Sequence, residues 1–81
     1  MLENLKKGDV VVVDIGGAHL TVVDVKHVDD KNGFNIKILV SATSGYFDLA
    51  YNIEGHSSGS YDSFGVHGFD PLNIIAVIRN H

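Results

Sequence analysis

Residues 8–25, GDVVVVDIGGAHLTVVDV, decide the fold class of this 81-residue chain. Two runs rich in β-branched residues, 10–15 and 20–25, flank a short break that contains Gly16 and Gly17. β-Branched side chains favour strands, and a short glycine break between two such runs is typical of a β-hairpin. An antiparallel pair of strands is therefore predicted near the start of the chain.

Three further strands are predicted downstream of this hairpin. Residues 34–41 and 46–53 alternate apolar with mostly polar side chains, which is typical of strands with one buried face. The turn sequence DDKNG at 29–33 joins the first of them to the hairpin, and 72–79 form a last apolar strand after Pro71. The side chains expected to face the core include Val11, Val13 and Ile15, then Phe34, Ile36, Ile38 and Val40, then Phe47, Leu49, Tyr51 and Ile53.

Five short strands without a long helix predict an all-β fold. The simplest arrangement is a small five-stranded SH3-like barrel with a long loop before the last strand, because closure removes the exposed edges of an open sheet. The chain has room for one domain, 1–81, since a protein of this size buries only about 60 % of the surface that its unfolded chain exposes. A core this small supplies about 3–5 kcal/mol, so assembly into a homo-oligomer would help. Residues 1–7 suit a single helical turn or an extended arm.

Composition and charge exclude several classes of protein. The chain has no cysteine, so neither disulfides nor a thiolate zinc site can hold the fold together. The net charge is −4 with only six lysine and arginine residues, which argues against nucleic acid as the main partner, and the ten acidic residues are too scattered to imitate it. No apolar run approaches the roughly 20 residues of a membrane span and no signal sequence precedes Gly8, so we expect a cytoplasmic protein without a membrane partner.

The segment 54–71, EGHSSGSYDSFGVHGFDP, has no sustained period. Loops longer than about 12–15 residues are uncommon in compact domains and are often functional. We therefore expect a binding loop in which the rings of Tyr61 and Phe64 supply contact area. The polar side chains expected to contribute are His56, Ser58, Asp62 and His67. The alternative is that Phe64 and Phe69 fold back and plug the end of the barrel, which is the favoured interpretation for Phe69 because it lies next to the last strand.

Neither catalysis nor a bound cofactor is expected. Residues 55–59, GHSSG, match the G-x-S-x-G pattern of serine hydrolases, but that motif needs a strand-to-helix turn above a large parallel sheet, which 81 residues cannot build. The five histidines lack the spacing of a metal site. His56, Asp62, His67 and Asp70 could converge across loop 54–71, but their spacing is not specific for a metal. No catalytic residue, metal or cofactor is therefore assigned.

The opening hairpin resembles a group of known proteins. The GDVV of residues 8–11, the glycine pair 16–17 and the LTVV of 20–23 resemble the start of small uncharacterised bacterial and phage proteins, which implies an SH3-like barrel. The same start is similar to KOW-type modules of the translation and transcription machinery, but residues 16–19 lack the basic side chains that such modules carry in the first hairpin loop. Residues 51–55 and 70–75 also resemble the ending of small phage-encoded β proteins, which implies a phage origin.

Three functions are compatible with these patterns. The first is a non-catalytic protein-binding module that uses loop 54–71 and an exposed strand edge, and the resemblance to phage proteins implies a host or defence protein as its target. The second is an oligomeric protein that sequesters a small anionic, nucleotide-like ligand, since glycine-rich loops can cradle anions, although loop 54–71 contains no lysine. The third is a KOW-like module that contacts RNA.

Overall fold

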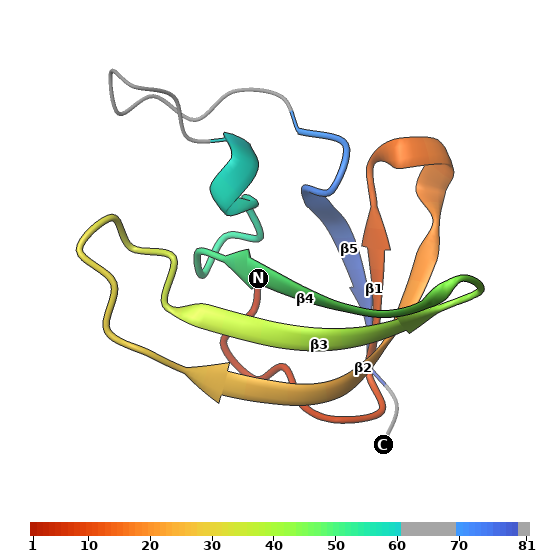
Figure 1. The fold of residues 1–81 in the computed structure, drawn as a ribbon, viewed down its shortest axis with the longest axis horizontal. Coiled ribbons are helices and arrows are strands. Elements are labelled where there is room, and N and C mark those ends of the chain that lie inside the picture. Colours follow the sequence, from red (N-terminus) through yellow and green to blue (C-terminus); the bar gives the residue numbers. More distant parts are fainter. Residues whose placement is uncertain (61–69, 80–81) are drawn as a thin grey trace.

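The computed structural model describes residues 1–60 and 70–79 (Figure 1). Five strands form one antiparallel sheet in the order β4-β3-β2-β1-β5. They are β1 (Val10–Val13), β2 (His19–His27), β3 (Ile36–Ala42), β4 (Gly45–Tyr51) and β5 (Ile74–Ile78), with two short 3₁₀ turns, η1 (Ile15–Gly17) and η2 (Ser58–Ser60). The all-β fold and the five predicted strands are confirmed. Within the described part of the chain, no helix is long and apolar enough to cross a membrane.

The opening hairpin forms where its sequence predicts. β1 pairs with β2, and η1 makes the turn between them (Figure 1). Gly16 and Gly17 have φ angles of 62° and 63°, a left-handed conformation that is unfavourable for residues with a side chain. β1 ends at Val13, earlier than expected, so Ile15 lies in the turn and is 57 % exposed instead of facing the core.

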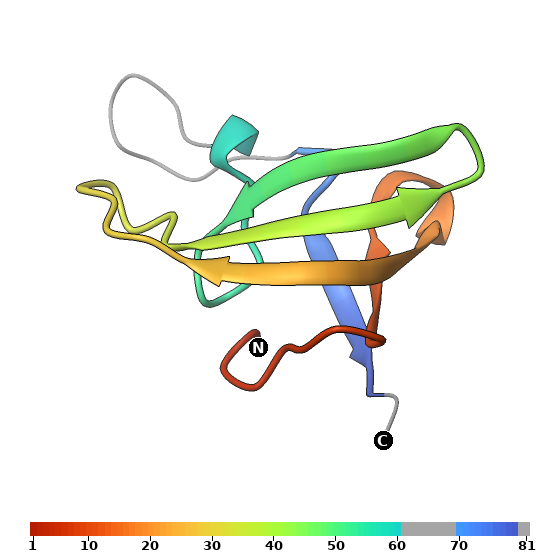
Figure 2. The ribbon, with the colours of Figure 1, turned by 60° about the horizontal axis from the view of Figure 1, so that its bottom comes forward.

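The sheet folds over on itself around β2, its longest strand. The first part of β2 pairs with β1 and the remainder with β3, and the register to β3 shifts between Val22 and Asp24. A bulge of this kind bends a strand and increases its twist. As a result, β2, β3 and β4 form one layer, and β1 and β5 cross it at a steep angle (Figures 1 and 2).

The core lies between these two layers. Its buried side chains are Leu2, Leu5, Val11, Val13, Leu20, Val22, Ile36, Ile38, Val40, Tyr51 and Ile74. All four inward residues predicted for residues 34–41 are buried, which confirms the alternation in that strand. The N-terminal arm is neither helix nor strand, but it contributes two leucines to the core, and the Leu2 N–H donates to the Ile53 carbonyl at 2.9 Å.

The barrel is open between β4 and β5. Among the described residues these two strands do not pair with each other. The turn after β4 connects them instead, because Ser57 bridges back to Tyr51 and the Ile74 N–H donates to the Gly55 carbonyl at 2.9 Å. The architecture is consistent with a small SH3-like barrel whose two edge strands are joined through residues 52–57 rather than directly.

Two of the inward residues predicted for residues 46–53 are exposed. β4 ends at Tyr51, which is fully buried, so Ile53 lies in the following turn. Phe47 is paired with the buried Val40 and lies on the inner face, but at the open side of the barrel, where no described strand covers it. Phe47 and Ile53 are each 45 % exposed. The alternation of apolar and polar residues therefore identifies the inner face of a strand, but it does not show whether another strand covers that face.

Candidate functional site

Only two of the predicted binding residues lie in the described part of the chain. Tyr61, Phe64, Asp62 and His67 lie outside the described residues. His56 is half-buried in the turn after β4, where its N–H donates to the side-chain oxygen of Asn52 at 2.9 Å and its carbonyl accepts from the Asn52 N–H at 3.0 Å. His56 therefore has a structural role in that turn, whereas Ser58 is exposed and lines a surface hollow.

The G-x-S-x-G segment does not form a nucleophile elbow. Ser57, the central serine, is buried, and its hydroxyl oxygen accepts from the Gly59 N–H at 3.2 Å. The Ser57 N–H donates to the Asn73 side-chain oxygen at 2.8 Å. The segment follows an antiparallel strand and ties the turn after β4 to the start of β5, so it connects the two edge strands.

Successive residues of β3 form backbone hydrogen bonds alternately with β2 and with β4. The Val28 N–H donates to the Asn35 carbonyl at 2.9 Å, just before β3 begins. Successive residues of an antiparallel strand direct their N–H and C=O to opposite sides. The N–H and C=O groups of the odd-numbered β3 residues up to residue 39 therefore form hydrogen bonds with β2. Those of the even-numbered residues form hydrogen bonds with β4. Since Ile38 is paired with Leu49, the odd-numbered residues of β4 direct their backbone groups to β3.

The opposite edge of β4 has three residues whose backbone groups are unpaired within the described structure. By the same alternation, Tyr46, Asp48 and Ala50 direct their N–H and C=O away from β3. Asn52, the next even-numbered residue, also directs its backbone away from β3, because its N–H donates to the His56 carbonyl in the following turn. Before that point, no described residue pairs with the edge.

An apolar groove of about 220 Å³ lies on the inner side of this edge. It occupies the open side of the barrel, between β4, the β1–β2 hairpin and the segment that leads into β5. The groove is lined only by apolar side chains, namely Val13, Ile15, Ala18, Leu20, Phe47, Leu49 and Leu72. The three large exposed side chains among them, Ile15, Phe47 and Leu72, keep more than a third of their surface exposed, which leaves them available for contact.

Hydrogen bonds hold the walls of the groove in place. The buried Tyr51 hydroxyl donates to the Leu72 carbonyl at 2.7 Å, and burial, with a smaller effect of the Asp70 charge, raises the pKa of Tyr51 well above its ordinary value. The Leu72 N–H donates to the Asp70 carboxylate at 2.8 Å. On the facing wall, the Ile15 N–H donates to the Pro71 carbonyl at 2.9 Å. The two walls are therefore connected through residues 70–72.

The outer face of the same strands carries two rows of side chains. One row is Asp24, Leu39 and Asp48, and the next is Lys26, Lys37 and Ala50. A hollow of about 500 Å³ extends over both rows and is bordered by Ser58. Within the described part of the chain, neither Lys26 nor Lys37 has a carboxylate oxygen within 4 Å of its ammonium group, since the ion pairs found there involve other residues.

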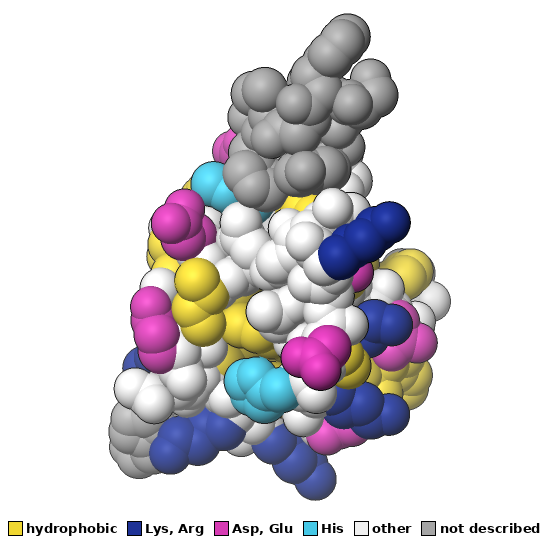
Figure 3. Space-filling view, turned by 90° about the vertical axis from the view of Figure 1, so that its left-hand side faces the viewer, with side chains coloured by type: hydrophobic (Ala, Val, Ile, Leu, Met, Phe, Trp, Pro, Cys, Tyr) yellow, Lys and Arg dark blue, Asp and Glu magenta, His cyan; other side chains and the backbone are white. Residues whose placement is uncertain are grey.

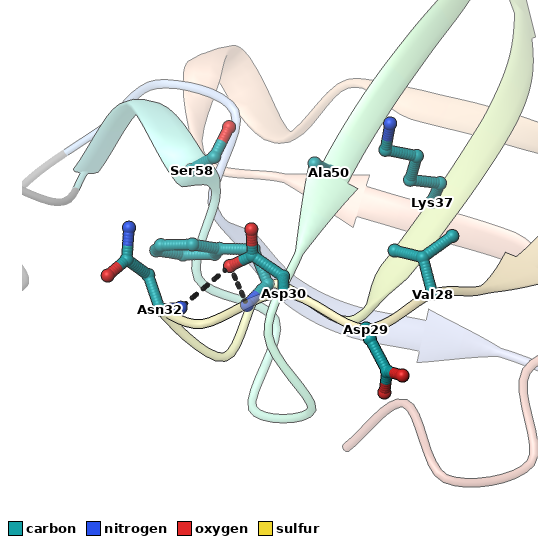
Figure 4. A pocket seen from close by; sticks show the side chains of 8 residues that line it. Val28, Asp29, Asp30, Asn32, Lys37, Ala50 and Ser58 are labelled. Carbon is teal, nitrogen blue, oxygen red and sulfur yellow. Dashed lines mark hydrogen bonds between the residues drawn. The ribbon is translucent and has the colours of Figure 1, made fainter.

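A second hollow, of about 350 Å³, continues from the first beside the loop between β2 and β3 (Figure 4). The two hollows share Lys37, Ala50 and Ser58, and in Figure 4 Ala50 lies between the other two side chains. Asp30 also lines this hollow, but its carboxylate accepts from the N–H groups of Asn32 and Phe34 at 3.0 and 3.1 Å and so stabilises the loop. The described residues contain no group of three or more histidine and acidic side chains placed to hold a metal.

Charges of both signs are mixed on the surface at this end of the molecule. In Figure 3, lysine and arginine side chains alternate with aspartate and glutamate around an area of neutral side chains. No family model matches the chain, and no curated protein or solved structure matches it. The resemblance to small bacterial and phage proteins therefore stays a prediction from the sequence.

Sequence reasoning missed the residues that form this site. It placed Ile15 and Phe47 in the core, and it assigned no role to Asp48 and Lys37. The alternation in residues 46–53 does contain the signal for which side chains share the outer face. What the sequence lacks is a signal that β4 is an edge strand, because that depends on the pairing of β1 with β5.

Proposed function

We propose that this protein is a non-catalytic protein-binding module that takes up an extended segment of a partner protein as an additional strand on β4. The observation that carries the proposal is the unpaired edge at Tyr46, Asp48 and Ala50, beside an apolar groove. In β-strand addition, main-chain hydrogen bonds supply affinity, and pockets for alternate side chains supply specificity. β4 offers both kinds of contact.

β4 itself lacks the residues that usually protect an edge strand. Natural edges commonly carry proline, lysine or a bulge that prevents pairing with another chain. β4 contains neither proline nor lysine, its register with β3 is continuous, and Asp48 is its only charged residue. Tyr46 and Phe47 are exposed beside the edge. An edge of this kind suits pairing with a partner strand.

The groove suits the inward side chains of such a strand. An added strand would point every second side chain toward Phe47, Ile15 and Leu72. Full burial of a large apolar side chain contributes roughly 1.5–3 kcal/mol. Because hydrogen bonds already fix both walls, little conformational entropy would be lost there on binding.

The described beginning of loop 54–71 borders the same edge. Ser58 lines the outer hollow beside Ala50. The aromatic residues predicted from the sequence to contact a partner, Tyr61 and Phe64, follow shortly after it in the chain, and we keep them as candidate contacts. A host or defence protein as the target rests on the resemblance to phage proteins alone.

A second candidate function is the sequestering of a small anionic ligand. The observation that favours it is the pair Lys26 and Lys37, which are directly opposite each other on β2 and β3 with no carboxylate within 4 Å in the described structure. Asp24 and Asp48 line the same hollow and weaken its attraction for an anion. A thermal shift assay against a panel of nucleotides distinguishes the two candidates, because a ligand of the native state raises the melting temperature.

Amide hydrogen exchange tests strand addition directly. Peptides selected against the protein from a random library displayed on phage serve as probes. We expect the amides of Tyr46, Asp48 and Ala50 to exchange rapidly in the free protein and to become protected in the complex, since they would then donate to the peptide. Peptides that bind while these three amides stay unprotected would refute the proposal.

N-methylated versions of a selected peptide provide the matched control. An added strand directs only every second N–H to β4, so N-methylation at those positions removes a donor from the pairing edge. Methylation at the intervening positions leaves these hydrogen bonds intact. We therefore expect N-methylation to abolish binding at the positions whose N–H faces β4 and to leave the affinity unchanged at the intervening positions. Equal losses at both sets of positions would show that the peptide binds by its side chains alone.

A further inference from the structure

We infer that the preferred partner of β4 is an extended segment with an acidic residue two positions before a basic one, separated and flanked by apolar residues, and that it binds antiparallel to β4. This inference rests on the proposed strand addition and specifies the chemistry of the added strand. It is carried by the two charged rows on the outer face of β2, β3 and β4.

Asp48 determines the basic position of the partner. It is exposed, it lies on the outer face, and its backbone groups are among those directed to the free edge. An added strand would place a side chain directly opposite Asp48 on the same face, at a Cα separation of about 5.5 Å. Opposite charges at such cross-strand positions attract and like charges repel. A lysine or arginine therefore fits there.

Lys37 determines the acidic position. The partner residue opposite Ala50 would be two strands away from Lys37, a backbone separation of roughly 10 Å. The small side chain of Ala50 leaves the space between them open, as the hollow of about 500 Å³ shows. A glutamate or aspartate can reach the Lys37 ammonium across this space. Lys26, opposite Lys37, adds to the attraction, and a partner carboxylate would relieve the repulsion between the two lysines.

The direction of the added strand sets the order of the two charges. Every strand pair in the described sheet is antiparallel, and antiparallel pairs are the commoner kind in proteins. In an antiparallel partner, the residue opposite Ala50 comes two positions before the residue opposite Asp48. The acidic residue therefore precedes the basic one.

A second copy of this chain does not supply such a segment from its own described edge strands. β5 reads IIAVI and carries no charge, and Asp48 is the only charged residue of β4. Pairing of β4 with another β4 would therefore leave the acidic row without a basic partner. The charge pattern thus favours a different protein as the occupant.

Two synthetic peptides of identical composition test the order of charges. One contains Val-Glu-Val-Lys-Val and the other Val-Lys-Val-Glu-Val, each flanked by Gly-Ser, and both are titrated into the ¹⁵N-labelled protein. We expect both to protect the amides of Tyr46, Asp48 and Ala50, with the Glu-first peptide binding about tenfold more tightly. Equal affinity, or tighter binding of the Lys-first peptide, with the same amides protected would overturn this inference and leave the strand addition standing.

A charge-reversed variant provides the matched control. Asp48→Lys combined with Lys37→Glu exchanges two exposed side chains, so the fold should be retained, and the preference between the two peptides should reverse. An unchanged preference in a folded variant would refute the assignment of Asp48 and Lys37. If neither peptide protects the β4 amides, or if the free protein is a dimer in ultracentrifugation with these amides already protected, the strand addition itself and the inference that rests on it both fail.

Discussion

The two ends of the barrel are finished in different ways. At the end where β1 begins, the N-terminal arm covers the core with Leu2 and Leu5, and Asp9 is completely buried beneath it. At the end where β1 leads into η1, the apolar groove stays open and Ile15 and Phe47 are exposed. One strand thus connects a closed end, which serves stability, to an open end, which leaves apolar surface and an unpaired edge for a partner.

The closed end depends on a buried carboxylate. Asp9 accepts from the Lys6 N–H at 3.1 Å and from the Arg79 guanidinium at 3.4 Å, and Arg79 also donates to the Met1 carbonyl at 3.0 Å. These contacts join the arm, the start of β1 and the residue after β5. In the described part of the open end, hydrogen bonds from Tyr51 and Ile15 connect the walls of the groove through residues 71 and 72, and no buried carboxylate takes part.

Asp9→Ala should cause a large loss of stability at the closed end. The change leaves the part-buried Lys6 N–H without its acceptor and Arg79 without its carboxylate partner, which we expect to lower the free energy of unfolding by about 2–3 kcal/mol. Urea denaturation followed by circular dichroism measures it. Asp24→Ala, at an exposed position, is the control and should change stability by less than about 0.5 kcal/mol. Similar losses in both variants would contradict the assigned role of the closed end.

Tyr51→Phe should have an intermediate effect. It removes the donor to the Leu72 carbonyl, at an expected cost of about 1–2 kcal/mol. The pKa of Tyr51 is raised in the folded state, so the unfolded state loses this proton first, and the contribution is fully present below the ordinary tyrosine pKa of 10.0 and is lost as pH rises above it. Stability measured between pH 9 and pH 11 should therefore fall more steeply for the native protein than for Tyr51→Phe. Parallel curves would show that another group titrates.

Phe47→Ser should separate binding from stability. Because Phe47 is nearly half exposed, the variant should lose less than about 1 kcal/mol of stability, but binding of a selected peptide should weaken by at least tenfold. Ile38→Ala, at a buried position of the core, is the matched comparison and should lower the free energy of unfolding by about 2–5 kcal/mol. Calorimetric titration and urea denaturation give the two quantities. Unchanged peptide affinity in Phe47→Ser would place the partner elsewhere.

Ala50→Pro should change stability little. The Ala50 N–H is directed away from β3, so proline at this edge position removes no ladder hydrogen bond, and we expect a change within about 1 kcal/mol. Peptide binding should be lost, because the N–H that would donate to the added strand is gone. Leu49→Pro removes a hydrogen bond to β3 instead and should unfold the protein. Retained peptide binding in a folded Ala50→Pro variant would contradict pairing at this edge.

The sequence was sufficient for the fold class but not for the site. The alternation in residues 34–41 predicted the buried face of β3, and the glycine break predicted the first hairpin, since both signals are local. Ile15 and Ile53 lie in turns beyond the ends of their strands, so the prediction that they face the core was wrong. Phe47 lies on the predicted inner face but is exposed, because the cover over a strand depends on elements distant in the chain. The opposition of Lys26 and Lys37 likewise depends on the register across the loop at 28–35, which composition does not determine.

The connection through Asp9 also has a consequence for the order of folding. β2, β3 and β4 are joined by short loops, so their contacts can form early and at little entropic cost. β1 and β5 are separated by most of the chain, and Asp9 meets Arg79 only once they have paired. Protection against hydrogen exchange during refolding should therefore arise in the β2–β3–β4 meander first, and the closed end should be the last part of the molecule to exclude water.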